Sequence, residues 1–144
     1  MANPGPASTT TIHPQTLSAN QAVRLLAYGS GVSVGTAGDA AITMPVISTS
    51  TYNVTQVVMT NANKDISAGA LAIWTGPAGT GTEIVTNATL TSMTTAAYVI
   101  NATVVTATKT VNLAAQTIYV KVGTAVAGGT LDIFVYGYDF STFS

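Results

Sequence analysis

The sequence predicts an all-β fold: an antiparallel β-sandwich of about eight strands with a jelly-roll-like form. Short stretches in which apolar and polar residues alternate recur along the chain, which is the pattern of half-buried strands. Glycine-rich turn signals separate them at intervals of about 8–14 residues, a spacing typical of sandwiches and barrels. No long amphipathic helix alternates with these stretches, which argues against a parallel α/β fold. About eight strands suit a jelly roll better than a seven-stranded immunoglobulin-like domain, and the pairing order stays open.

The 144 residues are predicted to form one domain preceded by an arm. Residues 1–20 contain a Pro-Gly-Pro segment and a Ser/Thr run, which favour an extended arm, and residues 21–144 form the sandwich. The chain starts with no basic cluster and no apolar stretch, so we expect no secretory signal peptide and synthesis in the host cytoplasm. An unordered terminus is the alternative reading of the arm. We expect the arm to contact a neighbouring molecule through Thr11, Ile12, Pro14 and Leu17.

Three strands are predicted in the first part of the sandwich. Residues 18–28 fit either a short helix with a capping box or a strand, and the β character of their surroundings favours the strand. Residues 40–47 are strand-like, and Pro45 places them at a sheet edge because proline lacks the N–H that a ladder needs. Residues 52–60 are rich in Val and Thr, and their alternation slips near Gln56, which predicts a β-bulge.

The middle of the chain contains a hairpin-like pair and a third strand. Residues 69–75 alternate, the segment Gly-Pro-Ala-Gly-Thr-Gly at 76–81 predicts a turn, and residues 82–86 return as a strand. Residues 97–106 alternate again and form a further strand. The segment 90–97 that precedes them fits a short helix.

The last two strands have the clearest alternation. Every second residue is aliphatic in residues 117–122 and again at the start of residues 130–138. Between them, Ala-Gly-Gly-Thr at 127–130 predicts a hairpin turn, since glycine tolerates positive φ. We therefore predict that these two strands pair with each other.

The final strand is apolar on both faces, although a strand at the surface of a monomer should have one polar face. Its aliphatic face fits the core. The cover of its aromatic face is either another layer of the same domain or another subunit. Aromatic side chains are favoured at the centres of protein interfaces. We predict that a subunit contact contains Phe134, Tyr136 and Tyr138 of the strand, or Phe140 and Phe143 of the tail.

Charged residues make up 6% of the chain, whereas a typical soluble domain has about 25%. The net charge is −1, and the lysine and arginine residues are spread out, so we expect no nucleic-acid partner and no basic membrane-surface helix. No apolar run approaches the roughly 18–20 residues of a membrane-spanning helix. Surfaces with so few charges favour association, so we expect the chain to bind itself. The absence of cysteine excludes disulfides and thiol chemistry.

No catalytic or metal-binding motif stands out. Residues 76–82 resemble the glycine-rich part of a phosphate-binding loop, but Thr82 occupies the place of the required lysine and a strand follows. The single histidine, His13, lies in the arm without the rigid frame of a triad. The five acidic residues are scattered along the chain and do not form the oxygen cluster of a calcium loop. We therefore expect no enzymatic activity, no cofactor and no bound metal.

Several segments resemble the small β-sandwich head decoration (cement) proteins of tailed bacteriophages. The resemblance rests on Gly69–Thr75, the glycine turn that leads into Glu83–Val85, Gln116–Val122 and Gly129–Gly137, and it spans roughly residues 20–140. It implies a jelly-roll domain, commonly a homotrimer, seated on the exterior of the virion capsid. It further implies that the chain clamps neighbouring subunits of the major capsid protein against the pressure of packaged DNA, without catalytic residues.

Other classes of function remain open at this point. A glycan-binding or adhesive module of a tail fibre or spike would use an exposed aromatic ring as a stacking platform, with Trp74, Tyr28 and Tyr98 as the candidates. A tail or spike component, or a major shell protein in its own right, is a third class.

Overall fold

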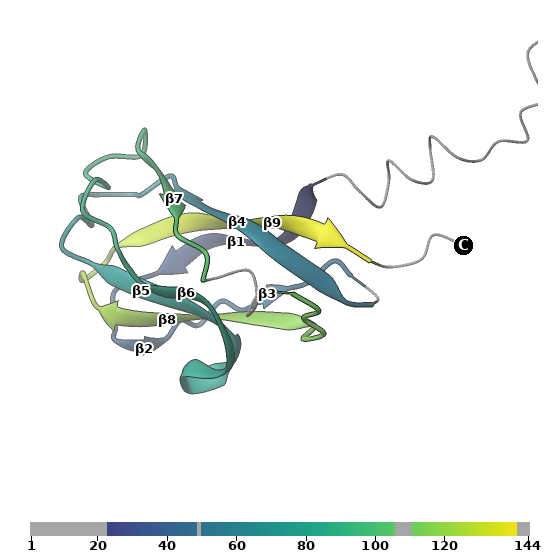
Figure 1. The fold of residues 1–144 in the computed structure, drawn as a ribbon. Coiled ribbons are helices and arrows are strands. Elements are labelled where there is room, and N and C mark those ends of the chain that lie inside the picture. The colour runs from purple at the N-terminus through teal and green to yellow at the C-terminus, as the bar shows by residue number, and fades with distance from the viewer. Residues whose placement is uncertain (1–22, 49, 106–110, 141–144) are drawn as a thin grey trace, which may run out of the picture.

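The computed structural model describes residues 23–48, 50–105 and 111–140 as two antiparallel β-sheets packed face to face (Figure 1). The residues of the predicted arm, Thr11, Ile12, Pro14 and Leu17, lie outside the described residues, as does Phe143. The strands are β1 Arg24–Ser33, β2 Gly38–Asp39, β3 Met44–Pro45, β4 Tyr52–Thr60, β5 Ala70–Gly76, β6 Thr80–Thr89, β7 Val99–Ala102, β8 Thr117–Thr124 and β9 Thr130–Asp139, with one 3₁₀ turn, η1 Pro77–Gly79.

The strand order is that of a jelly roll. One sheet has the order β1-β9-β4-β7, and the other has the order β2-β8-β5-β6, with β3 also paired to β8. The antiparallel pairs are nested along the chain: β5 with β6, β4 with β7, β2 and β3 with β8, and β1 with β9. This nested ribbon then folds over, so that β9 also pairs with β4 and β8 with β5. The predicted all-β sandwich of jelly-roll type is confirmed.

The nine strands of the described residues fill eight strand positions, because β2 and β3 form one interrupted edge strand. Asp39 pairs with Lys121 of β8, and Met44 pairs with Ile118. Four residues therefore lie between the paired positions on the edge, against two on β8, and the ladder is broken there. Pro45 ends this strand, so the predicted edge position of residues 40–47 is confirmed.

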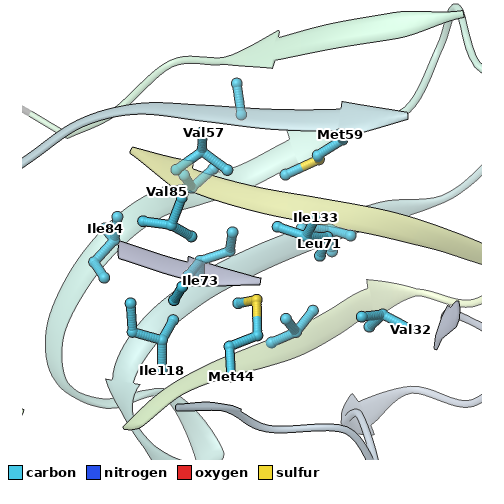
Figure 2. Close-up of a cluster of buried hydrophobic side chains, with 14 of the residues drawn as sticks. Val32, Met44, Val57, Met59, Leu71, Ile73, Ile84, Val85, Ile118 and Ile133 are labelled. Carbon is cyan, nitrogen blue, oxygen red and sulfur yellow. The ribbon is translucent and has the colours of Figure 1, made fainter. Parts of the chain in front are cut away.

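Apolar side chains from the facing sides of the two sheets form a single core (Figure 2). They come from alternate positions along the strands, as a period-two pattern requires. Tyr52 is the largest of the fully buried side chains, and its hydroxyl donates a hydrogen bond to the carbonyl oxygen of Ala115 over 2.7 Å. Burial raises the pKa of Tyr52 to about 12. The labelled core residues in Figure 2 are Val32, Met44, Val57, Met59, Leu71, Ile73, Ile84, Val85, Ile118 and Ile133.

The predicted hairpin of the last two strands is wrong. β8 pairs with β2, β3 and β5 in one sheet, whereas β9 pairs with β1 and β4 in the other. The glycine turn reverses the chain as predicted, but it crosses from sheet to sheet. Two backbone hydrogen bonds fix this crossing. The Val34 N–H donates to the Gly129 carbonyl, and the Gly129 N–H donates to the Val126 carbonyl. Alternation identifies the inward face of each strand and carries no information about which strand lies beside it.

The predicted helix near residues 90–97 is also absent, because turns occupy that segment of the described chain. Leu90 and Met93 are both fully buried and are three residues apart, which imitates one face of a helix. Their backbone groups instead bond across the loop: the Leu90 N–H donates to Gly69, and the Met93 carbonyl accepts from Ile66. Tertiary contacts therefore override the local helical spacing.

Three smaller predictions have mixed outcomes. The bulge near Gln56 is confirmed, since the β4–β9 register shifts between Val54 and Gln56. The strand reading of residues 18–28 is confirmed from Arg24 onward, where β1 begins. The strand predicted for residues 97–106 is shorter than expected, because β7 ends at Ala102.

Gly137 in β9 lies opposite the bulged part of β4, and a Cβ atom at this position would overlap the carbonyl oxygen of Asn53. We expect Gly137→Ala to lower the free energy of unfolding by about 1–3 kcal/mol or more, because backbone must move to make room. Urea denaturation midpoints measure the change. Thr86→Ala, an exposed substitution in β6 of the other sheet, is the control and should stay within about 0.5 kcal/mol of the parent chain. Equal midpoints for the two variants would contradict the close backbone approach.

Candidate functional site

The outer face of the sheet formed by β1, β9, β4 and β7 is the first candidate for a functional surface. In β9, Leu131, Ile133 and Val135 point inward and are fully buried. The alternate side chains, from Asp132 through Phe134, Tyr136 and Tyr138, point outward and are only half-buried. Within the part of the chain that the structure describes, no layer covers this face. We call Tyr28, Val58, Phe134, Tyr136 and Tyr138 the aromatic face.

Cross-strand pairing brings these residues into register. Phe134 stands opposite Tyr28 of β1 on one side and Val58 of β4 on the other. The ring centroids of Tyr28 and Phe134 are 4.8 Å apart with an interplanar angle of 32°, and Phe134 and Tyr136 are 6.4 Å apart at 17°. Aromatic pairs at these separations contribute beyond the area that they bury. The rings therefore form an ordered apolar strip across the middle of the sheet.

Sequence reasoning missed the contribution of β1 to this strip because of a bulge. Leu25 pairs with Tyr136 and Ala27 with Val135, so Leu26 and Ala27 together oppose one residue of β9. Both are fully buried. The extra residue turns Leu25 and Tyr28 outward on the same side, although a strict period of two would place them on opposite faces. Gln56 sits on the far side of Tyr136 and donates a hydrogen bond from Nε2 to Asn101 Oδ1 over 2.8 Å.

Asp132 is the acidic side chain on the outer side of this sheet, and hydrogen bonds from neighbouring groups satisfy its carboxylate. Its Oδ1 accepts from Ser30 Oγ at 3.0 Å and from the Gly31 N–H at 2.7 Å. Its Oδ2 accepts from Asn61 Nδ2 at 2.8 Å. Burial by itself raises the pKa of Asp132, but the hydrogen bonds from Asn61, Gly31 and Ser30 outweigh it and hold the pKa below its usual value. The carboxylate thus ties the β1 and β4 ends to β9.

The other charged groups near the face form an ion pair where β1 starts and β9 ends. Arg24 Nη1 lies 3.2 Å from Asp139 Oδ2, and the Asp139 side chain is only 2% exposed. Ser48 Oγ donates to Asp139 Oδ1 over 2.8 Å. Phe140 follows directly, and its N–H donates to the Thr51 carbonyl over 3.0 Å while its side chain is 42% exposed. Charge at this end is therefore paired, and an aromatic ring projects beside it.

The predicted contact residues are thus partly brought together. Phe134, Tyr136 and Tyr138 share one surface with Tyr28, and Phe140 follows at its end. Of the other proposed stacking platforms, Tyr98 is exposed next to β7, and Trp74 lies in the second sheet.

The remaining acidic residues serve local structure or stand apart from one another. Asp39 accepts a hydrogen bond from the Ala78 N–H at 2.7 Å, which fixes the 3₁₀ turn against the sheet edge. Hydrogen bonds from the side chain and backbone of Ser67 lower the pKa of Asp65. Among the described residues, no three His, Cys, Asp or Glu side chains come close enough to hold a metal ion. The described chain also contains no helix with the length and hydropathy needed to cross a bilayer.

Comparison with protein-family models, with curated proteins and with solved structures gives no match for this chain. The fold and the surface geometry therefore carry the functional argument.

Asp132 gives a test of the electrostatics of this face. Because its pKa in the folded chain lies below the ordinary 3.8, its ionised form stabilises the fold above that pH, and this contribution is lost as the pH falls through the folded pKa. We expect Asp132→Asn to be less stable than the parent chain near neutral pH and to approach it in acid. Urea midpoints across the acid range measure the gap. A gap that stays constant with pH would show that the carboxylate charge plays no part.

Proposed function

We propose that this chain is a virion structural protein: a capsid decoration protein that forms a homo-oligomer and binds subunits of the major capsid protein on the exterior of a phage head. The observation that carries the proposal is the aromatic face, an ordered apolar strip on the outer side of a sheet in a chain with few charges. Interface centres are enriched in aromatic residues and depleted of charge. Both charged groups that border the strip, Asp132 and Asp139, are already satisfied within the fold.

Most sheet edges offer only short or partly covered stretches for association by strand addition, and the β7 edge has four residues. Beside β1, Val46 bridges Ala27, and the Ile47 N–H donates to Leu26 over 2.7 Å. Beside β6, Val104 bridges Val85. The edge made by β2 and β3 is short and ends in proline, a common protection against edge-to-edge pairing. Faces are therefore the better surfaces for a partner, and the aromatic face is the more apolar one.

The size of the face indicates how it would be used. Three strands about 30 Å long and the four-residue β7, about 13 Å long, lie about 4.8 Å apart and together cover roughly 500 Å². A stable interface takes about 800 Å² from each partner. The whole outer face of this sheet, of which the aromatic face is one part, falls short, so a lasting contact needs further apolar surface. The sequence offers it in Phe140 and Phe143 after β9 and in the arm before β1.

The mechanism we propose is linkage between binding and shell stability. A protein that binds only the assembled shell stabilises it by its own binding free energy, RT ln(1 + [L]/Kd) per site. A site that is occupied at about 100 times its Kd contributes about 2.7 kcal/mol. Many copies bind to one shell, and the sum of their binding free energies opposes the internal pressure of packaged DNA. No chemical step is needed. The trimeric state follows from the resemblance to decoration proteins.

The oligomeric state tests the aromatic face. We expect the purified chain to form an oligomer, commonly a trimer, and the double variant Phe134→Ser, Tyr136→Ser to dissociate, because polar side chains remove the apolar contact. Light scattering after size exclusion gives the mass, and circular dichroism checks the fold. The control is Ile42→Ser, which changes a side chain of 36% exposure in the segment between β2 and β3, away from the aromatic face. A parent chain that is monomeric at every concentration, or a control that dissociates equally, would contradict the proposal.

The location of the chain in the particle tests the function itself. We expect electron cryomicroscopy of the virion to show this fold on the outer capsid surface in many copies, in contact with the major capsid protein. Disruption of the gene should make the heads more sensitive to heat. A chain found at the tip of a tail fibre would support the adhesive class instead, and a chain absent from the particle would overturn a virion role.

A further inference from the structure

The outer face of the second sheet carries a hollow of about 210 Å³ beside the only tryptophan of the chain. Trp74 projects from β5, between Glu83 of β6 and Tyr119 of β8. The hollow is lined by Ala72, Trp74, Glu83, Asn87, Lys121 and Gly123.

Small residues create this hollow. Ala72 pairs with Lys121 of β8. Its methyl side chain is too short to fill the space beside the indole ring of Trp74. Gly123 of β8 has no side chain, and a Cβ there would overlap Oδ1 of Asn87. The Asn87 side chain from β6 therefore reaches across β5 to β8 and walls the hollow opposite Trp74.

The polar groups around the hollow have unused hydrogen-bonding capacity. The side chains of Glu83 and Asn87 make no hydrogen bond to any described residue. Lys121 Nζ donates to the Ala78 carbonyl over 3.3 Å and keeps two further donors. Trp74 Nε1 is covered and has no acceptor among the described residues. Most covered polar atoms have a partner, so the unpaired Trp74 Nε1 is an exception within the described residues. The Glu83 side chain is half-buried and that of Asn87 is exposed, so both keep hydrogen-bonding capacity available to a ligand in the hollow.

We propose that this hollow is a saccharide-binding site that holds one sugar ring of a neutral glycan. The flat indole ring is suited to the C–H face of a sugar, and the surrounding carboxylate, amide and ammonium groups supply acceptors and donors for hydroxyl groups. The negative charge of Glu83 and the positive charge of Lys121 cancel in the lining of the hollow. This balance favours a neutral ligand over an anion or a cation. The volume lies below the roughly 300–1,000 Å³ of sites that enclose drug-sized ligands, so a single ring fits.

A second hollow indicates how a longer glycan would continue. Trp74 and Glu83 also line a neighbouring space of about 490 Å³, which extends past Thr82 to Asn112. The indole thus stands between two adjacent hollows. A chain of sugars would pass over it, with neighbouring rings on either side. This site lies on the opposite sheet from the aromatic face, so it does not depend on the proposed contact between subunits.

The test uses a glycan array and the intrinsic fluorescence of the single tryptophan of the full-length chain. The array is followed by titration with the best array hit and with maltohexaose, cellohexaose and chitohexaose. We expect at least one neutral glycan to bind and to change the emission of Trp74. Glu83→Gln and Asn87→Ala leave the ring in place and should each weaken binding measurably. Trp74→Leu should weaken it about tenfold or more, equivalent to about 1.4 kcal/mol, when binding is measured by calorimetry.

The control separates this site from other exposed rings. Tyr98→Ser changes a side chain just before β7 of the other sheet that is 48% exposed and lies outside the aromatic face, and it should leave glycan affinity unchanged. Thermal melts confirm that each variant is folded. The proposal is overturned if no neutral glycan binds, if Glu83→Gln and Asn87→Ala bind like the parent chain, or if Tyr98→Ser loses affinity to the same extent. Failure of this test leaves the capsid proposal intact, because particle location is measured separately.

Discussion

The position of β9 in the centre of its sheet is the constraint on which the rest of the structure depends. Its backbone pairs with β1 on one side and with β4 on the other, and its inner side chains fill the core. Gly137 permits the close approach to β4, and Asp139 joins the strand end to Arg24. The strand therefore has no free edge and no free inner face. Its outer face is what remains available, and that face carries aromatic rings where a solvated strand would carry polar side chains.

A chain with few charges uses nearly all of its acidic groups to hold backbone in place. Asp39 fixes the 3₁₀ turn, Asp65 caps its own loop through Ser67, Asp132 gathers three donors from β1 and from the end of β4, and Asp139 pairs with Arg24. Each of these acts at a strand end or a turn, where backbone N–H groups lack ladder partners. Glu83 is the exception. It makes no such contact with the described residues, and it stands beside Trp74 and within the lining of both hollows.

The fold class was predictable from the sequence because alternation and glycine turns are local signals. The burial of Ile118, Val120 and Val122 and of Leu131, Ile133 and Val135 follows directly from their spacing. The partner of each strand was not predictable, because a chain reversal at Gly128 looks the same whether it joins neighbours or crosses between sheets. The contribution of Tyr28 in β1 to the aromatic face depended on the bulge between Leu25 and Ala27. The hollow at Trp74 depended on contact between Asn87 and Gly123, which are far apart in sequence.

The short or partly covered edges of the sandwich favour interaction through the two sheet faces, and these faces differ in chemistry. The aromatic face is apolar, and its neighbouring charges are satisfied internally, as in the centre of a protein interface. The opposite face combines one indole ring with polar groups that the described residues leave unpaired. A broad apolar strip gains the most free energy when another protein covers it and excludes water. A small hollow with mixed donors and acceptors gains the most free energy from binding a small polar ligand. One sandwich can therefore attach to an assembly through one sheet and present a ligand site on the other.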